Sequence, residues 1–110
     1  MAYDEGLAAR ARRLLEPRDG IVEKKMFGGL AFLLDRNLCV GVREDELMVR
    51  VPPEQHDALL AKPHACVLDL TGRPMAGWLL IGAEGLRSGP ALKRWVEIGA
   101  RFASTLPTRR

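Results

Sequence analysis

The chain has 110 residues, of which 47% are hydrophobic and 28% are charged, and its formal net charge is +3. This length and balance predict one globular domain that can bury a core without metals or disulfides. The longest apolar run, at 30–34, is too short for a membrane-spanning helix, which needs about 20 residues. The N-terminal residues also lack the apolar segment of a signal peptide, so we expect a cytoplasmic protein that makes no membrane contact.

The first expected element is a helix at residues 4–15. Asp4 is suited to cap its N-terminus, and Pro17 with the Asp19-Gly20 pair ends it. Its apolar residues recur at helical spacing and form one stripe: Leu7, Ala8, Ala11, Leu14 and Leu15.

Residues 21–51 have the composition and turn spacing of β-structure. Four strands are expected, at 21–27, 30–35, 38–43 and 46–51. Gly28-Gly29, Arg36-Asn37 and Glu44-Asp45 are the expected connections. Because connections this short cannot carry a parallel crossover, the strands are predicted to form an antiparallel meander.

The second half of the chain is predicted to contain two helices and two strands. Pro52-Pro53 stops the sheet and starts a short helix at 53–61, which is followed by strands at 65–70 and 77–82. A final helix at 89–105 has an apolar stripe formed by Leu92, Trp95, Val96, Gly99, Phe102, Ala103 and Leu106. On its outer side, Glu97 is spaced to pair with Lys93 and with Arg101.

The resulting element order, α-β-β-β-β-α-β-β-α, predicts an α+β domain at residues 1–107 with helices packed on an antiparallel sheet. Residues 108–110 are expected to be a disordered basic tail. Both alternate faces of the 30–35 strand are apolar, whereas a sheet with one wet face would alternate with polar residues. We therefore expect the second face to be covered by a helix or by a second copy, and we predict a homodimer.

Neither the cysteines nor the histidines are spaced for a metal site. Cys39 and Cys66 lie in apolar, strand-like segments, which favours buried, reduced thiols. His56 and His64 flank the short helix without a cysteine or acidic cluster at metal-binding spacing. No cofactor is expected.

Lys24 and Lys25 precede the diglycine and superficially resemble a phosphate-binding loop. In a true P-loop the lysine follows the glycines, between a strand and a helix, so a diglycine hairpin with lysines at its rim is favoured. Arg73 and Trp78 belong to a loop, at 72–78, in which the indole either stacks on a ligand or packs on the core. These four residues are the candidate contacts of a small ligand.

The C-terminal quarter of the chain is basic. Residues 87–110 carry a net charge of +5 and the rest of the chain −2. Within this region Lys93, Arg94 and Arg101 lie on the final helix, where they are candidate contacts for an acidic partner or for nucleic acid phosphates. A solvated helix face accounts for the same pattern.

Residues suited to catalysis are scarce. Ser88 and Ser104 have no nucleophile-elbow context and no evident His-Asp partner, and the carboxylates at 44–46 lie in a charged turn. We therefore expect a protein that is not an enzyme.

Several segments together resemble the N-terminal domain of the TfoX/Sxy family, bacterial proteins associated with the regulation of natural competence. The resemblance runs from about residue 2 to 107. The segments that carry it are MAYDEGLA at 1–8, KKMFGGLAF at 24–32, NLCVGV at 37–42, LMVRV at 47–51, GRPMAGW at 72–78 and the Trp-Val helix at the C-terminus.

This resemblance implies a fold similar to secretion chaperones and YjbR-type domains. It also implies a non-enzymatic regulatory or interaction module that acts through a protein partner. Full-length competence regulators carry a further C-terminal domain of helix-hairpin-helix character, and this chain is expected to stand alone without it. Direct, largely sequence-independent DNA binding by the final helix and small-ligand binding are the alternatives.

Overall fold

The computed structural model describes residues 3–26, 28–69 and 77–107. Its helices are α1 (Glu5–Leu15), α2 (His56–Leu60) and α3 (Gly89–Ser104). Its strands are β1 (Ile21–Met26), β2 (Gly29–Leu34), β3 (Asn37–Arg43), β4 (Glu46–Arg50), β5 (Ala65–Val67) and β6 (Trp78–Ile81). Two short 3-10 helices, η1 (Pro53–Gln55) and η2 (Ala83–Leu86), precede α2 and α3. The predicted α+β element order is confirmed.

The six strands form one antiparallel sheet with the order β1-β2-β3-β4-β6-β5. Gly28 and Gly29 lie in the β1–β2 hairpin, where Met26 pairs with Gly29, and no helix follows them. The diglycine is therefore a hairpin connection, as favoured from the sequence.

Most predicted elements differ from the observed ones by one residue at an end, and three differences stand out. The left-handed turn between β2 and β3 is formed by Asp35 and Arg36, because the buried Asn37 already belongs to β3. The helix expected at 53–61 is divided into η1 and α2. The strand expected at 65–70 ends at Val67, and residue 70 lies outside the described residues, as does the 108–110 tail.

Asn37 holds the C-terminal end of the described chain. Its side-chain amide is buried and donates a hydrogen bond to the carbonyl oxygen of Pro107 at 2.9 Å. This hydrogen bond offsets the free-energy cost of removing the amide from water.

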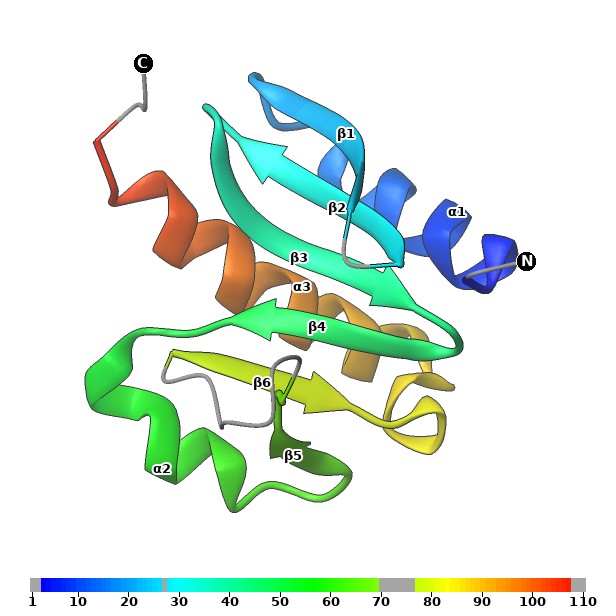
Figure 1. Cartoon of the computed structure of the whole chain (residues 1–110), viewed down its shortest axis with the longest axis vertical. Coiled ribbons are helices and arrows are strands. Elements are labelled where there is room, and N and C mark those ends of the chain that lie inside the picture. Colours follow the sequence, from blue (N-terminus) through cyan, green and yellow to red (C-terminus); the bar gives the residue numbers. More distant parts are fainter. Residues whose placement is uncertain (1–2, 27, 70–76, 108–110) are drawn as a thin grey trace.

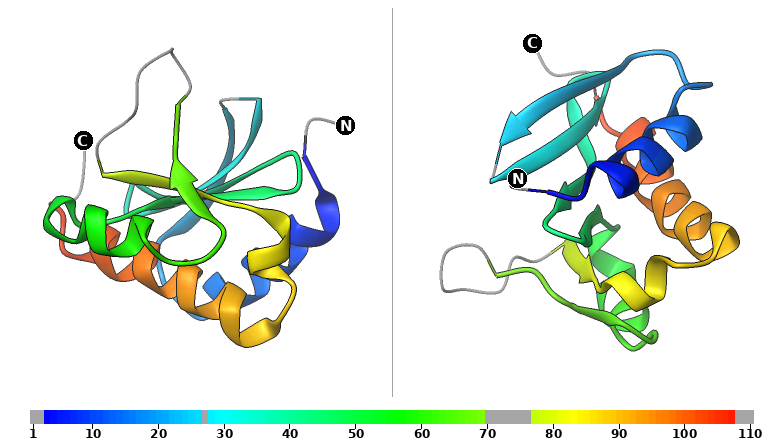
Figure 2. Two further views of the ribbon diagram at one scale, coloured as in Figure 1. Left: turned by 90° about the horizontal axis from the view of Figure 1, so that it is seen from below. Right: turned by 90° about the vertical axis from the view of Figure 1, so that its right-hand side faces the viewer.

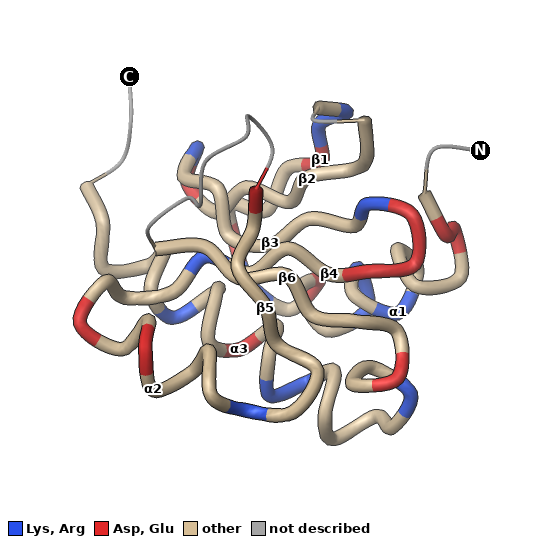
Figure 3. The backbone as a smooth tube through the Cα atoms, turned by 60° about the horizontal axis from the view of Figure 1, so that its bottom comes forward, with Lys and Arg blue, Asp and Glu red and all other residues tan. Residues whose placement is uncertain are grey.

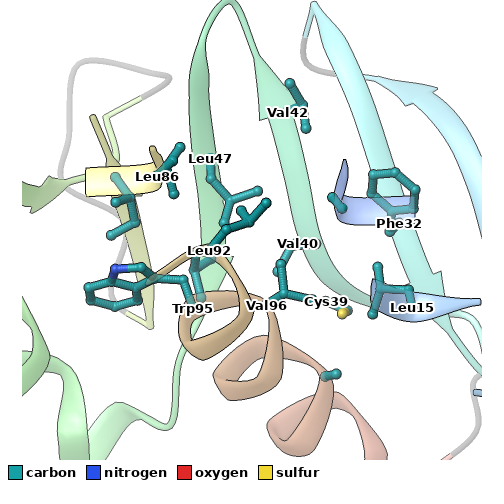
Figure 4. Close-up of a cluster of buried hydrophobic side chains, with 14 of the residues drawn as sticks. Leu15, Phe32, Cys39, Val40, Val42, Leu47, Leu86, Leu92, Trp95 and Val96 are labelled. Carbon is teal, nitrogen blue, oxygen red and sulfur yellow. The ribbon is translucent and has the colours of Figure 1, made fainter. Parts of the chain in front are cut away.

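Helices α1 and α3 cover one face of the sheet, whereas α2 lies beside the β4–β6–β5 end (Figures 1 and 2). Leu92 and Val96 of α3 point toward the sheet residues Leu47 and Val40, and the Trp95 indole extends on the side of Leu86 (Figure 4). Trp95 is therefore a core residue, as its place on the apolar stripe predicts. The described part of the chain contains no helix long and apolar enough to cross a bilayer.

The opposite face of the sheet has no helix over it among the described residues (Figure 2). Its centre is nevertheless buried within one copy: Gly41 pairs with Ala31 and with Met48, and the Met48 side chain is 2% exposed. At the edge of this face Val22 is 58% exposed. Pairing of two copies through this face stays a prediction.

Close contact between α3 and β3 depends on the absence of a side chain at Gly99. A Cβ atom at this position would lie 2.5 Å from the carbonyl oxygen of Cys39 and 2.7 Å from Cγ1 of Val40. The first neighbour is backbone, which cannot rotate away, so any larger residue would displace the helix.

We expect Gly99→Ala to lower the free energy of unfolding by about 1–3 kcal/mol, because overpacking outweighs the gain of about 1 kcal/mol in helix propensity. Gly89→Ala is the matched control, since a Cβ at Gly89 meets no atom within 4 Å. Urea denaturation of both variants checks this, and equal stabilities for the two would contradict the close contact.

Candidate partner-binding surface on helix α3

Lys93, Arg94 and Arg101 all lie on the exposed side of α3. Arg94 and Arg101 are seven residues apart, which places them on the same side of the helix about 10 Å apart along its axis. Lys93 lies beside Arg94. The helix thus presents these three cations on the side that faces away from the core.

The two i, i+4 pairs expected on α3 do not form. The carboxylate of Glu97 accepts a hydrogen bond from the guanidinium of Arg18 at 2.9 Å, and the Lys93 and Arg101 side chains have no ion pair among the described residues. A residue 79 positions away in the sequence therefore neutralises Glu97. No signal in the sequence singles out Arg18, because only tertiary packing brings it to α3.

The cations of the neighbouring helix α1 mostly have structural partners. The guanidinium of Arg10 donates to the carbonyl oxygens of Leu86 and Arg87, at 2.8 and 3.3 Å. Arg12 forms a two-point pair with the carboxylate of Glu23 on β1. The hydrogen bond from Arg12 lowers the pKa of Glu23. Lys and Arg positions are spread over several elements in Figure 3, and those on the exposed side of α3 are Lys93, Arg94 and Arg101.

The candidate ligand contacts Lys24, Lys25 and Trp78 are distributed across the sheet. Lys24 and Lys25 are exposed on the edge strand β1 and, as successive strand residues, point to opposite faces. Trp78 is half-buried on β6, and the strands β2, β3 and β4 lie between it and β1. Arg73 lies outside the described residues. Lysines on an edge strand also discourage pairing with another sheet.

The two serines form local hydrogen bonds at the two ends of α3. The Ser88 hydroxyl caps α3 by accepting from the amide of Ala91 at 3.1 Å, and the Ser104 hydroxyl donates to the carbonyl oxygen of Arg101. In the described residues no group of three His, Cys, Asp or Glu side chains is placed to hold a metal ion.

The two cysteines have different environments, which corrects the expectation that both are buried. Cys39 on β3 is completely buried, and this burial raises its pKa to about 12. Cys66 is exposed because it lies on the short edge strand β5. Both thiols are free.

We expect an aromatic disulfide reagent at pH 8 to modify one thiol rapidly in the native protein and two after denaturation, because only the thiolate attacks. Cys66→Ser should remove the rapid phase, while Cys39→Ser should retain it. Equal reaction rates for the two native thiols would contradict the burial of Cys39.

The fold and this surface together define a small α+β domain with a cationic helix on one side of an antiparallel sheet. The family model of the TfoX N-terminal domain matches residues 13–103, so the chain belongs to the TfoX N-terminal domain family. No curated protein and no solved structure gives a significant match.

Proposed function

We propose that this domain is a non-enzymatic module of gene regulation that binds an acidic surface of a protein partner through the outer side of α3. The observation that carries the proposal is the set of Lys93, Arg94 and Arg101, which stand on a rigid helix without ion-pair partners among the described residues. The regulatory context comes from the resemblance to competence regulators.

A protein surface is favoured over DNA because α3 does not protrude from the domain. The helix packs on β3, β4 and α1, so only a strip of it is open to solvent. A helix of about 10–12 Å diameter must project to enter a major groove about 12 Å wide. A flat strip of cations instead suits a flat, acidic partner surface, where rim charges steer association.

The number of cations also favours a protein partner. Three phosphate contacts would give log Kobs a salt slope of only about −2.7, which is typical of weak, non-specific binding. We therefore expect labelled duplex DNA to bind this domain only at low salt, with micromolar or weaker affinity.

Fluorescence anisotropy across a salt series checks this expectation for three proteins. They are the wild type, the triple variant Lys93→Gln/Arg94→Gln/Arg101→Gln, and a control that loses the same charge elsewhere, Arg13→Gln/Lys24→Gln/Lys25→Gln. Tight DNA binding at physiological salt that is lost in the triple variant and kept in the control would contradict the proposal and identify DNA as the partner of α3.

The partner itself is tested by affinity capture from bacterial extract with the same three proteins immobilised. We expect a partner that is retained by the wild type and the control, with at least about tenfold less recovered on the triple variant, and that is released in 0.5 M salt because exposed charges are then screened. Equal recovery on all three proteins would show that α3 is not the binding surface.

A further inference from the structure

A hollow of about 280 Å³ separates helix α3 from the connection between α2 and β5. Three segments supply its walls: Lys62 and His64 come from the connection, Glu84 and Gly85 from η2, and Arg94 and Trp95 from α3. The connection passes across α3 in Figure 2, and Figure 3 shows Lys or Arg positions on both segments at this place. The hollow is thus assembled by the fold from residues far apart in the sequence.

The connection is fixed against η2 at His64. The carbonyl oxygen of His64 accepts a hydrogen bond from the amide of Gly82 at 2.9 Å. The backbone of His64 has a φ of 68°, in the left-handed region that a histidine seldom adopts. Gly85 leaves room for this residue, because a Cβ there would lie 2.8 Å from Cβ of His64. Strained backbone held in place by its surroundings is common at binding sites.

The walls of the hollow offer hydrogen-bond donors without partners. Among the described residues, neither the Lys62 ammonium nor the Arg94 guanidinium has an ion pair or a hydrogen bond, and the indole N–H of Trp95 has no acceptor. Glu84 is the one carboxylate of the wall and lies 4.0 Å from Arg87. Donors therefore outnumber acceptors around the hollow, and its net charge is positive.

We propose that this hollow binds a small phosphate monoester. A phosphate has three terminal oxygens, enough to accept from Lys62, Arg94 and the His64 ring together, whereas a carboxylate has two. Glu84 is placed at the wall to accept a hydrogen bond from a hydroxyl group on the organic part. The volume of about 280 Å³ lies just below the range of ligand pockets, which begins at about 300 Å³, and this limits the ligand to a few carbon atoms.

Trp95 provides a direct readout, since the chain has only one other tryptophan, Trp78. In a Trp78→Phe background, titration with glycerol 3-phosphate at constant ionic strength should produce a saturable change in Trp95 fluorescence, and glycerol or chloride should not. In the wild type, the same titration followed by nuclear magnetic resonance should shift the Trp95 indole N–H and the Gly85 amide, while the Trp78 indole serves as internal control.

Two wall substitutions separate this site from general charge effects. Lys62→Gln and His64→Asn, which keeps a residue tolerant of the left-handed backbone, should each weaken binding of glycerol 3-phosphate about tenfold. The control Lys93→Gln removes a cation next to Arg94 that does not line the hollow, and it should leave the affinity unchanged.

Absence of a saturable signal, equal shifts of both indoles, or equal losses in Lys62→Gln and Lys93→Gln would each overturn the proposal. The two proposals share Arg94, but the Lys62 and His64 variants distinguish them, because neither residue is part of the α3 surface. A variant at either residue that loses the phosphate ester should still capture the protein partner.

Discussion

The seating of α3 on β3 is the constraint on which the rest of the molecule depends. At Gly99 the helix backbone comes so close to the Cys39 carbonyl that no side chain fits between them. This approach brings Leu92 and Val96 down into the core formed by the middle strands. Since one side of the helix is fixed in this way, the orientation of every residue on its other side is fixed too.

The positive charge on the exposed side of α3 depends on how the helix is seated on the sheet. The Arg18–Glu97 bond uses the acidic residue that would otherwise neutralise its neighbours on the helix, and the Arg10 and Arg12 contacts hold α1 to η2 and to β1. Exposed ion pairs of this kind contribute little to stability, usually below about 1 kcal/mol. Their main effect here is to decide which cations remain available to a partner.

Local patterns in the sequence account for most of the fold. The apolar stripes of α1 and α3, the Asp4 cap of α1 and the short turns of the meander are all encoded within a few neighbouring residues, and the structure has them at or near the predicted positions. The turn between β2 and β3 lies at Asp35–Arg36, one residue before the predicted Arg36-Asn37, because the Asn37 amide is buried and bonded to the Pro107 carbonyl. The turn propensity of asparagine reflects local backbone preference alone, and here the buried hydrogen bond to Pro107 overrides it.

The candidate sites depend on contacts between distant segments, which local sequence patterns do not contain. Helical spacing predicts the three cations on the outer side of α3. It also predicts that Glu97 pairs with Lys93 and Arg101, and it does not reveal that Glu97 binds Arg18 instead. The exposure of Cys66 follows from β5 being a three-residue edge strand, a property of the sheet order and not of the apolar residues around it. Lys62 and His64 are unremarkable in the sequence because only the packing of η2 and α3 gives them a shared hollow.

The bond from Asn37 to the Pro107 carbonyl has a practical consequence for protein engineering. It fixes the carbonyl of Pro107, the last described residue, next to the turn between β2 and β3. A fluorescent protein joined after residue 107 by a short linker would therefore report from that corner with a defined orientation. Replacing Asn37 would free the junction, and energy transfer from such a fusion would then average over many more geometries.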